Sequence, residues 1–212
     1  MPSSTWRDSW RQDLASFLPS GGDQRAVARL IASWTRDDLV FARDHLVRNA
    51  VAGSTLTPRF VRWFIYRAVG FDVQTPNILE HCLFRASSLS VGVGSCVGSG
   101  CHFEGVGAVS IGRSTFIGPG TMMLTSHHGN DPDGSVTAAP EPRPVVVGDD
   151  VWIGGRCLLV PGAVVEDNCV IGAGSVVVGR CETGGVYAGV PARRVAERAE
   201  KAVVGSPEEP NA

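Results

Sequence analysis

A period of six residues runs through the second half of the chain and restricts its fold more than any other feature. From residue 91 on, each hexad opens with a large apolar side chain. These residues are Val91, Val97, Phe103, Ile111, Ile117, Met123, Val147, Ile153, Leu159, Val165, Ile171 and Val177. A repeat this short forms one strand and one turn, and it buries its apolar side only by stacking on neighbouring coils. The sequence therefore predicts a mainly β fold, a parallel β-helix over residues 71–196.

The period is interrupted twice. Phe103 and Ile111 are eight residues apart instead of six, which indicates a bulge or an inserted corner. Between Met123 and Val147 the hexads stop, and the intervening segment is rich in Asn, Asp, Gly and Pro, which are typical of turns. We expect an excursion loop to leave the coil at about residues 127–145.

Most of the six cysteines have a place in the repeat. Cys157, Cys169 and Cys181 are twelve residues apart, twice the period, and each lies four residues after the opening residue of a hexad, as Cys101 does. The other residues at this position are small or compact, which predicts that it points inward at a tight corner. Cysteine packs as a small apolar residue, and no CxxC pair occurs, so we interpret these as buried structural thiols and expect no metal site.

Residues 1–70 have helical spacing instead, and we interpret them as a helical N-terminal extension. One apolar stripe comprises Trp6, Trp10, Leu14 and Phe17. Further helices are expected over residues 23–34, 36–51 and 58–69. Thr57 is the expected N-cap of the last helix, with Pro58 at its first helical position. At the other end, residues 197–212 are expected to hold the end of a short C-terminal helix and a disordered tail.

The helix expected over residues 58–69 combines Arg59, Arg62 and Arg67 with several aromatic residues. One interpretation is a helix that lies on an anionic membrane surface. The interpretation that we favour is a helix whose aromatic side docks on the rest of the protein while its arginines extend to solvent.

Charge and hydropathy exclude several classes of protein. The formal net charge is -2 and the isoelectric point is near 6.2, so there is no basic field of the kind that binds nucleic acid. No stretch has the roughly 18 apolar residues of a membrane span, and the first residues lack the apolar core of a signal peptide. We therefore expect a cytoplasmic protein without a membrane span.

Three further stretches are specific: "LTSHHGND" at 124–131, "VGDDVWIGG" at 147–155 and "VYAGVPARRV" at 186–195. With the hexads, they resemble the hexapeptide-repeat acetyltransferases, whose fold is a left-handed β-helix. The similarity is greatest to the sugar O-acetyltransferase branch with galactoside, maltose and colanic-acid enzymes. The resemblance implies a homotrimer with active sites between subunits. It also implies acetyl-CoA as donor, no metal, and transfer to a hydroxyl of a sugar or glycosylated small molecule.

The resemblance also implies roles for individual residues. Members of the family place a catalytic histidine after a Thr-x-His pattern at the start of such an excursion, and Thr125-Ser126-His127 matches it. His127 would be the general base of a direct transfer without an acyl-enzyme, and His128 takes the role if the register shifts by one. A side chain with a pKa near 6.5 suits this task, because a sugar hydroxyl is a poor nucleophile until its proton is removed.

Carried over position by position, the donor site would comprise Trp152, Gly155, Ala173, Val178 and Arg193. The backbone amide of Gly155 would bind the oxyanion, and Trp152 would line the cleft or pack one coil on the next. Ala173 and Val178 would follow the pantetheine arm. Arg193 would bind nucleotide phosphates through its planar guanidinium, and Arg194 could substitute for it.

Glu104 is either an acceptor ligand or an exposed corner residue. Three other functions stay open: N-acetylation of an amino sugar, a γ-carbonic-anhydrase-like zinc enzyme, and a non-catalytic β-helix scaffold. The zinc enzyme is the minor alternative, because it needs three converging histidines and His81, His102 and His127 are scattered along the sequence.

Overall fold

The computed structural model describes residues 24–86, 88–130, 133–136 and 139–199, and the chain divides into two compact units, Met1–Leu46 and Val47–Ala212. The described part of the first unit is helix α2, Gln24–His45. We predicted a break near Thr35, but α2 is continuous there. The Thr35 hydroxyl donates to the Ile31 carbonyl one turn earlier, so its polar group is satisfied inside the helix. The predicted stripe from Trp6 to Phe17 lies outside the described residues.

A π-helical segment, Leu46–Val51, and helix α3, Arg59–Ala68, follow in the chain. The predicted N-cap was wrong by one residue. Pro58 is the cap, and its carbonyl accepts from the Arg62 N–H. The Thr57 hydroxyl donates to the Val51 carbonyl instead, so it is not available to cap the helix.

The interpretation of α3 that we favoured holds only in part: Trp63 packs on the core and Arg59 and Arg67 are exposed, as expected, but three other residues are reversed. Arg62 and Tyr66 are buried, whereas the rings of Phe60 and Phe64 are exposed. The Arg62 guanidinium donates to the carbonyls of Ala52, Ser54, Thr57 and Ile78 at 2.6–3.1 Å. A buried guanidinium with several carbonyl partners is satisfied, and this explains why an arginine faces inward here.

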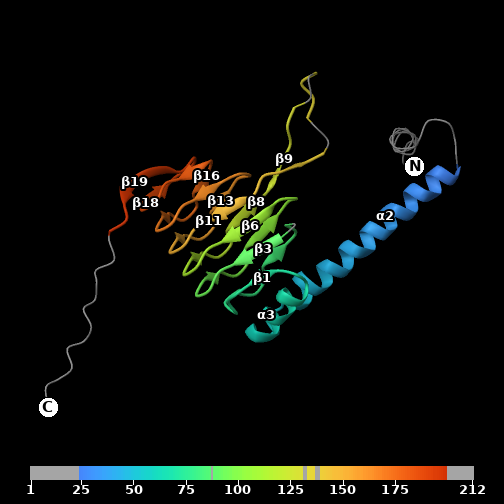
Figure 1. The fold of residues 1–212 in the computed structure, drawn as a ribbon, viewed down its shortest axis with the longest axis horizontal. Coiled ribbons are helices and arrows are strands. Elements are labelled where there is room, and N and C mark those ends of the chain that lie inside the picture. The colour runs from blue at the N-terminus through green and yellow to red at the C-terminus, as the bar shows by residue number, and fades with distance from the viewer. Residues whose placement is uncertain (1–23, 87, 131–132, 137–138, 200–212) are drawn as a thin grey trace, which may run out of the picture. The chain divides into compact units, whose positions relative to one another are not determined.

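The hexads form three parallel sheets that wind around a common core (Figure 1). Sheet A contains β1 (Asp72–Val73), β3 (Ser88–Val91), β6 (Ala108–Ile111), β11 (Val145–Val147), β14 (Val164–Val165) and β17 (Arg180–Cys181). Sheet B contains β4 (Cys96–Val97), β7 (Phe116–Ile117), β12 (Trp152–Ile153), β15 (Val170–Ile171), β18 (Gly185–Ala188) and β19 (Arg193–Glu197). Sheet C contains β2 (Leu83–Phe84), β5 (His102–Glu104), β8 (Met122–Leu124), β13 (Leu158–Leu159) and β16 (Val176–Val177). The predicted fold class, a mainly β parallel β-helix, is confirmed.

Burial follows the predicted period. Every opening residue of a hexad is at most 3% exposed. The residues four positions later are buried as well, except His127, which follows Met123 where the chain leaves the coil. Cys101, Cys157, Cys169 and Cys181 are all buried, which confirms their structural interpretation, although Cys181 lies in strand β17 opposite Val165 and not at a corner. Burial raises the pKa of Cys157 and Cys169, and it raises the pKa of Cys181 to about 11, so these thiols stay protonated near neutral pH.

Each coil turns three corners, which we name by the sheets that they join. The AB corner comprises residues 92–95, 112–115, 148–151, 166–169 and 182–184. The BC corner comprises residues 98–101, 118–121, 154–157 and 172–175. The CA corner comprises residues 105–107, 125–144, 160–163 and 178–179.

The CA corner holds both interruptions of the period. The two additional residues fall between β5 and β6, and the excursion begins after β8. Its base is an antiparallel pair, β9 (Ser126–His127) with β10 (Glu141–Pro142), and it projects beyond the coils (Figure 1).

The C-terminal end of the described chain differs from the expected helix. Residues 193–197 form β19, which pairs antiparallel with β18 and covers the end of sheet B. The remaining residues of the predicted helix and tail, from 200 on, lie outside the described residues. Among the described helices, none combines the length and the apolar character needed to cross a membrane.

Candidate active site

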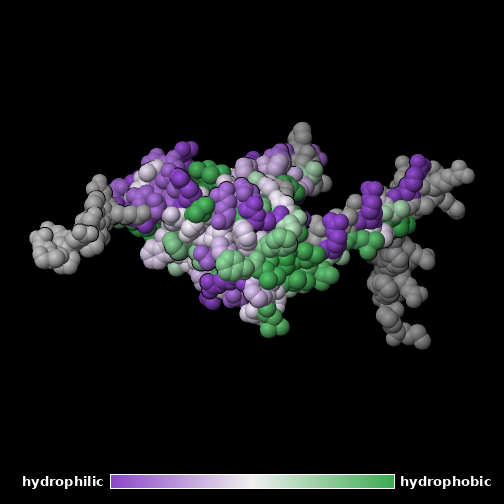
Figure 2. Space-filling view, turned by 60° about the horizontal axis from the view of Figure 1, so that its bottom comes forward, coloured by the Kyte–Doolittle hydropathy of each residue, from purple (hydrophilic) through white to green (hydrophobic). Residues whose placement is uncertain are grey.

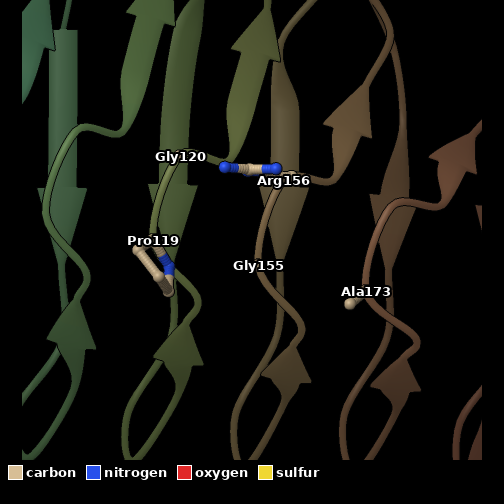
Figure 3. Close-up of a pocket in the computed structure, with 5 residues that line it drawn as sticks. All are labelled: Pro119, Gly120, Gly155, Arg156 and Ala173. Atoms are coloured by element: carbon tan, nitrogen blue, oxygen red, sulfur yellow. The ribbon is translucent and has the colours of Figure 1, made fainter.

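A pocket of about 460 Å³ lies on the BC corner, lined by Pro119, Gly120, Gly155, Arg156 and Ala173 (Figure 3). Pro119, Gly155 and Ala173 lie side by side on successive coils, and each is the second residue after an inward isoleucine. The pocket therefore runs along the helix axis and crosses three coils at one hexad position.

The wall of this pocket is mainly backbone because the coils approach closely here. A Cβ atom at Gly118 would lie 2.4 Å from the Gly155 nitrogen, and one at Gly154 would lie 2.5 Å from the Ala173 nitrogen. No side chain fits at these contacts, so glycine is required. The result is a smooth wall that an extended, flexible ligand can follow.

The pocket also presents a hydrogen-bond donor. The Gly155 carbonyl accepts from the Gly174 N–H at 2.9 Å, but the backbone hydrogen bonds between described residues do not use the Gly155 N–H as a donor. On the preceding coil the equivalent residue is Pro119, which has no N–H. The Gly155 N–H can therefore bind an acceptor atom of a ligand.

Arg156 is the cationic group of the pocket. Its backbone has a φ of 57°, and its side chain lies over Gly120, where a Cβ atom would be 3.4 Å from the Arg156 Cγ (Figure 3). The guanidinium is exposed, so it is available to an anionic part of a ligand.

His127 lies on the CA corner, in β9 opposite Glu141 of β10. The histidine is half-buried, whereas His128 is exposed. Thr125, two residues before His127, fixes the start of the excursion: its hydroxyl lies 3.0 Å from the Gly107 nitrogen, from which it accepts, and 3.2 Å from the Glu104 carbonyl oxygen. The longer connection between β5 and β6, which contains the two additional residues, thus anchors the segment that carries His127 through this hydrogen bond.

Glu104 lies next to the corner that carries His127. It is the last residue of β5 and pairs in register with Leu124, and its carboxylate lies 3.4 Å from the Arg85 guanidinium. Val178, which we predicted to line the donor site with Ala173, lies on the CA corner after β16 and is exposed. The structure therefore does not bring Val178 to the pocket.

Trp152 and Arg193 are not among the residues that line the pocket. Trp152 projects outward from sheet B, 58% exposed, in register with Phe116 on the neighbouring coil. Arg193 is exposed on β19, and its Nη1 donates to the Ala192 carbonyl at 3.0 Å. Arg194 lies 3.5 Å from Glu182, forms an ion pair with Glu197 and stacks on Tyr187, so its guanidinium already has partners.

Comparison with known proteins shows what these coils resemble. Residues 144–179 match the family described as bacterial transferase hexapeptide (six repeats). Nodulation protein L of Rhizobium meliloti (strain 1021) is 33% identical over 143 residues, which cover 66% of this chain and 78% of that protein. The chain belongs to the hexapeptide-repeat acetyltransferase family.

Two other members extend the comparison. The putative lipopolysaccharide biosynthesis O-acetyl transferase WbbJ of Escherichia coli (strain K12) is 35% identical over 101 residues, 43% of this chain. The match spans about half the length of that relative, 52%. A crystal structure of a maltose O-acetyltransferase from Clostridium difficile 630 superposes with a TM-score of 0.61 and 28% identity, covering 70% of this chain and 81% of that one.

In this member of the family, the predicted site residues form two groups. Gly155 and Ala173 meet at the pocket on the BC corner, whereas His127 lies on the CA corner and Glu104 is the last residue of β5 before that corner. Sheet C lies between the two corners. Its strands have two or three residues, so at 3.3 Å per residue the corners are separated by a strand about 7–10 Å long.

Sequence reasoning missed Pro119, Gly120 and Arg156. Pro119 could have been predicted, because it occupies the same position of its hexad as Gly155 and Ala173. In the described part of the chain, no three His, Cys, Asp or Glu side chains come together to hold a metal ion.

Proposed function

We propose that this chain transfers an acetyl group from acetyl-CoA to a hydroxyl of a sugar or glycosylated small molecule. The proposal rests on two features of the same chain. One is a pocket lined by backbone in which the Gly155 N–H is free to donate, and the other is an excursion that carries the half-buried His127. Membership of the acetyltransferase family supports the donor. The sugar O-acetyltransferases among the similar proteins support the acceptor class.

The pocket suits the donor chemically. A pantetheine arm is long, flexible and only weakly polar, and the smooth wall beside Gly155 and Ala173 admits it without a clash. Arg156 lies in the pocket and can bind phosphate oxygens with its planar guanidinium. We propose Arg156 for this role beside Arg193, because Arg193 is on β19 and does not line the pocket.

Each proposed residue has one step. His127 removes the proton from the acceptor hydroxyl as the oxygen attacks the thioester carbon. The Gly155 N–H donates to the oxyanion that forms, a contribution of about 3 kcal/mol for a donor that need not reorganise. When the carbon–sulfur bond breaks, the proton on His127 passes to the leaving thiolate, so the enzyme returns to its starting state without an acyl-enzyme.

The proposed reaction needs a second subunit. His127 and the pocket of one chain are on different corners of the coil, with sheet C between them. If copies associate so that the CA corner of one faces the BC corner of the next, each His127 lies beside a neighbouring pocket. This is the arrangement that we propose for a homotrimer, and Glu104 would then contact the acceptor beside His127.

The role of His127 is tested by measuring binding and transfer separately. We expect calorimetry to show equal CoA affinity for the wild type and His127→Ala. Acetyl transfer to a panel of sugars should fall by about 10²- to 10⁴-fold in His127→Ala, the usual contribution of a general base. His128→Ala is the matched control and should retain activity. Absence of CoA binding in the wild type would refute the proposed function, and loss of transfer only in His128→Ala would assign the base to His128.

The shared site is tested by mixing two inactive variants. Ala173→Trp fills the pocket but keeps His127, and His127→Ala keeps the pocket. Co-refolded mixtures should recover part of the wild-type activity if each site combines two chains. No recovery in mixtures that contain both variants in one oligomer would show that the site lies within one chain.

A further inference from the structure

Helix α3 and the turn before it present an apolar surface that the β-helix does not cover. We call it the α3 patch, and it comprises Leu56, Phe60, Val61 and Phe64. Leu56 is 91% exposed, Phe60 72% and Phe64 67%. Figure 2, in which the bottom of the molecule in Figure 1 comes forward, shows hydrophobic surface gathered in one continuous area on this side. Exposed large side chains in such a cluster are characteristic of an interaction surface.

The α3 patch is held rigidly. The four carbonyl hydrogen bonds of Arg62 tie the helix to the preceding turn and to Ile78. Trp63 donates from its indole nitrogen to the Val73 carbonyl at 2.9 Å. Because the opposite face of α3 is fixed in this way, Phe60 and Phe64 cannot turn inward, and the apolar surface persists in the folded protein.

The segment that carries the α3 patch has charges of one sign, and the nearest carboxylate in the chain is the exposed Asp72 of β1, the strand on which α3 packs. From Leu46 to Phe71 the sequence contains four arginines and no Asp or Glu. Arg59 and Arg67 are exposed at the two ends of α3. Arg67 also donates to the Val73 carbonyl at 3.2 Å and stacks on Trp63, contacts that hold its cation beside the patch. The surface is therefore apolar in its centre and positive at its edges.

This combination favours an anionic lipid surface over a second copy of the chain. A two-fold contact between two α3 patches would place Arg59 and Arg67 of one copy against the same cations of the other, which is repulsive. At a bilayer, apolar side chains enter the boundary between head groups and acyl chains while guanidinium groups bind anionic head groups. Both properties of the patch are then satisfied at once.

We propose that the α3 patch docks this protein on the surface of a membrane that contains anionic lipids. The helix lies in the plane of the interface with Phe60, Phe64 and Leu56 inserted, and Arg59 and Arg67 contact the head groups. This inference does not depend on the proposed acetyl transfer.

The test is co-sedimentation of the full chain with vesicles of phosphatidylcholine, with and without phosphatidylglycerol. We expect binding to the phosphatidylglycerol vesicles that weakens as salt is added. Phe60→Ser/Phe64→Ser should lower the partition coefficient by at least about tenfold, because two exposed rings no longer insert. Arg59→Glu should lower it by about fivefold or more for anionic vesicles and leave the weak binding to phosphatidylcholine unchanged.

The matched control is Val93→Ser/Val106→Ser, which removes two exposed apolar side chains outside the α3 patch. This variant should bind vesicles as the wild type does, and circular dichroism and thermal unfolding should show that all variants are folded. Absence of vesicle binding by the wild type, or equal binding by Phe60→Ser/Phe64→Ser, would overturn the proposal. Sedimentation equilibrium showing that Phe60→Ser/Phe64→Ser dissociates an oligomer would also overturn it, because the patch would then be a subunit contact.

Discussion

The BC corner and the CA corner border the same sheet but expose different chemistry. At the BC corner the coils approach so closely that glycine is required at Gly118 and Gly154, and the exposed surface is mostly backbone. At the CA corner the period is interrupted, and ionisable side chains lie on it (His127) and next to it (Glu104). A corner with regular coils thus exposes a surface of backbone that can bind a ligand, whereas a corner where the period is interrupted has space for functional side chains.

The difference explains how a repeat fold acquires a site. Hydrogen bonds between coils saturate the backbone of the regular segments, so chemical groups are added only where the coil is left or where a corner amide remains free. The following predictions separate the two corners, beginning with the largest expected effect.

Blocking the BC corner should abolish donor binding without affecting the fold. Ala173 is exposed at the pocket, so Ala173→Trp fills the space without entering the core. We expect the CoA dissociation constant to rise by at least about 100-fold, which corresponds to about 2.7 kcal/mol, as measured by calorimetry. Val146→Trp, on the outer face of sheet A, is the control and should bind CoA normally. Unchanged affinity in Ala173→Trp would move the donor site away from this corner.

Two buried threonines allow the corners to be perturbed separately. Thr125 accepts from the Gly107 N–H on the CA corner, and Thr121 donates to the Gly154 carbonyl at 3.1 Å on the BC corner. Thr125→Val leaves the Gly107 donor unsatisfied and should cost about 1–3 kcal/mol of the free energy of unfolding. By displacing His127 it should lower kcat/KM by about 10- to 100-fold while CoA affinity stays constant.

The matched variant Thr121→Val should have the opposite kinetic profile, with weaker CoA binding and a smaller effect on kcat. Denaturant titration and steady-state kinetics on both variants check this. Equal losses of CoA affinity in the two variants would contradict the separation of the corners.

The requirement for glycine at the BC corner can be tested with neighbouring positions. A Cβ atom at Gly154 would lie 2.5 Å from the Ala173 nitrogen, whereas one at Gly174 would meet nothing within 4 Å. Gly154→Ala should therefore lower the free energy of unfolding by about 1–3 kcal/mol through overpacking and also weaken CoA binding. Gly174→Ala, where only the φ of 72° is unfavourable, should cost about 1 kcal/mol. Equal stability of the two variants would show that the coils separate easily.

A substitution at the AB corner should have the smallest effect. Because this corner has no proposed role in binding or transfer, it is the reference for the other two corners. Hydrogen bonds from Thr183 and Arg180 lower the pKa of Glu166 to about 2 from its ordinary value of 4.5. Since the folded-state value is the lower one, the stabilisation is present above about pH 4.5 and is lost as the pH falls towards 2. The difference in Tm between the wild type and Glu166→Gln should shrink over this range, and activity near neutral pH should not change. A constant difference in Tm down to pH 2 would contradict the assigned hydrogen bonds.

Much of the fold could be predicted because the period of six is local and repeats. The opening residues of the hexads and the inward cysteines were assigned correctly from spacing alone. Val178 was assigned to the donor site, although the period itself separates it from Ala173. Ile153 pairs with Ile171 eighteen residues later, so one coil is three hexads, and a count in threes places Val178 on the next corner.

The N-terminal helices show where sequence reasoning failed. The spacing located α3 to within one residue at each end, yet Arg62 was expected at the surface and Phe60 and Phe64 against the protein, and the structure reverses these three. Arg62 is buried because carbonyls of the turn from Ala52 to Thr57 and of Ile78 converge on it. That convergence is not visible in the helix's own sequence, where an arginine is normally expected at the surface.

The sequence by itself determined that this chain forms stacked coils, which side chains point inward and which segment leaves the coil, because a short period fixes local geometry and burial together. Only the tertiary structure decided that Pro119, Gly155 and Ala173 form one pocket, that His127 is on a different corner, and that α3 presents its rings to solvent. These properties depend on which coils become neighbours and on where unpaired carbonyls and N–H groups meet in space. Contacts of this kind join residues far apart in the chain, so no local pattern encodes them.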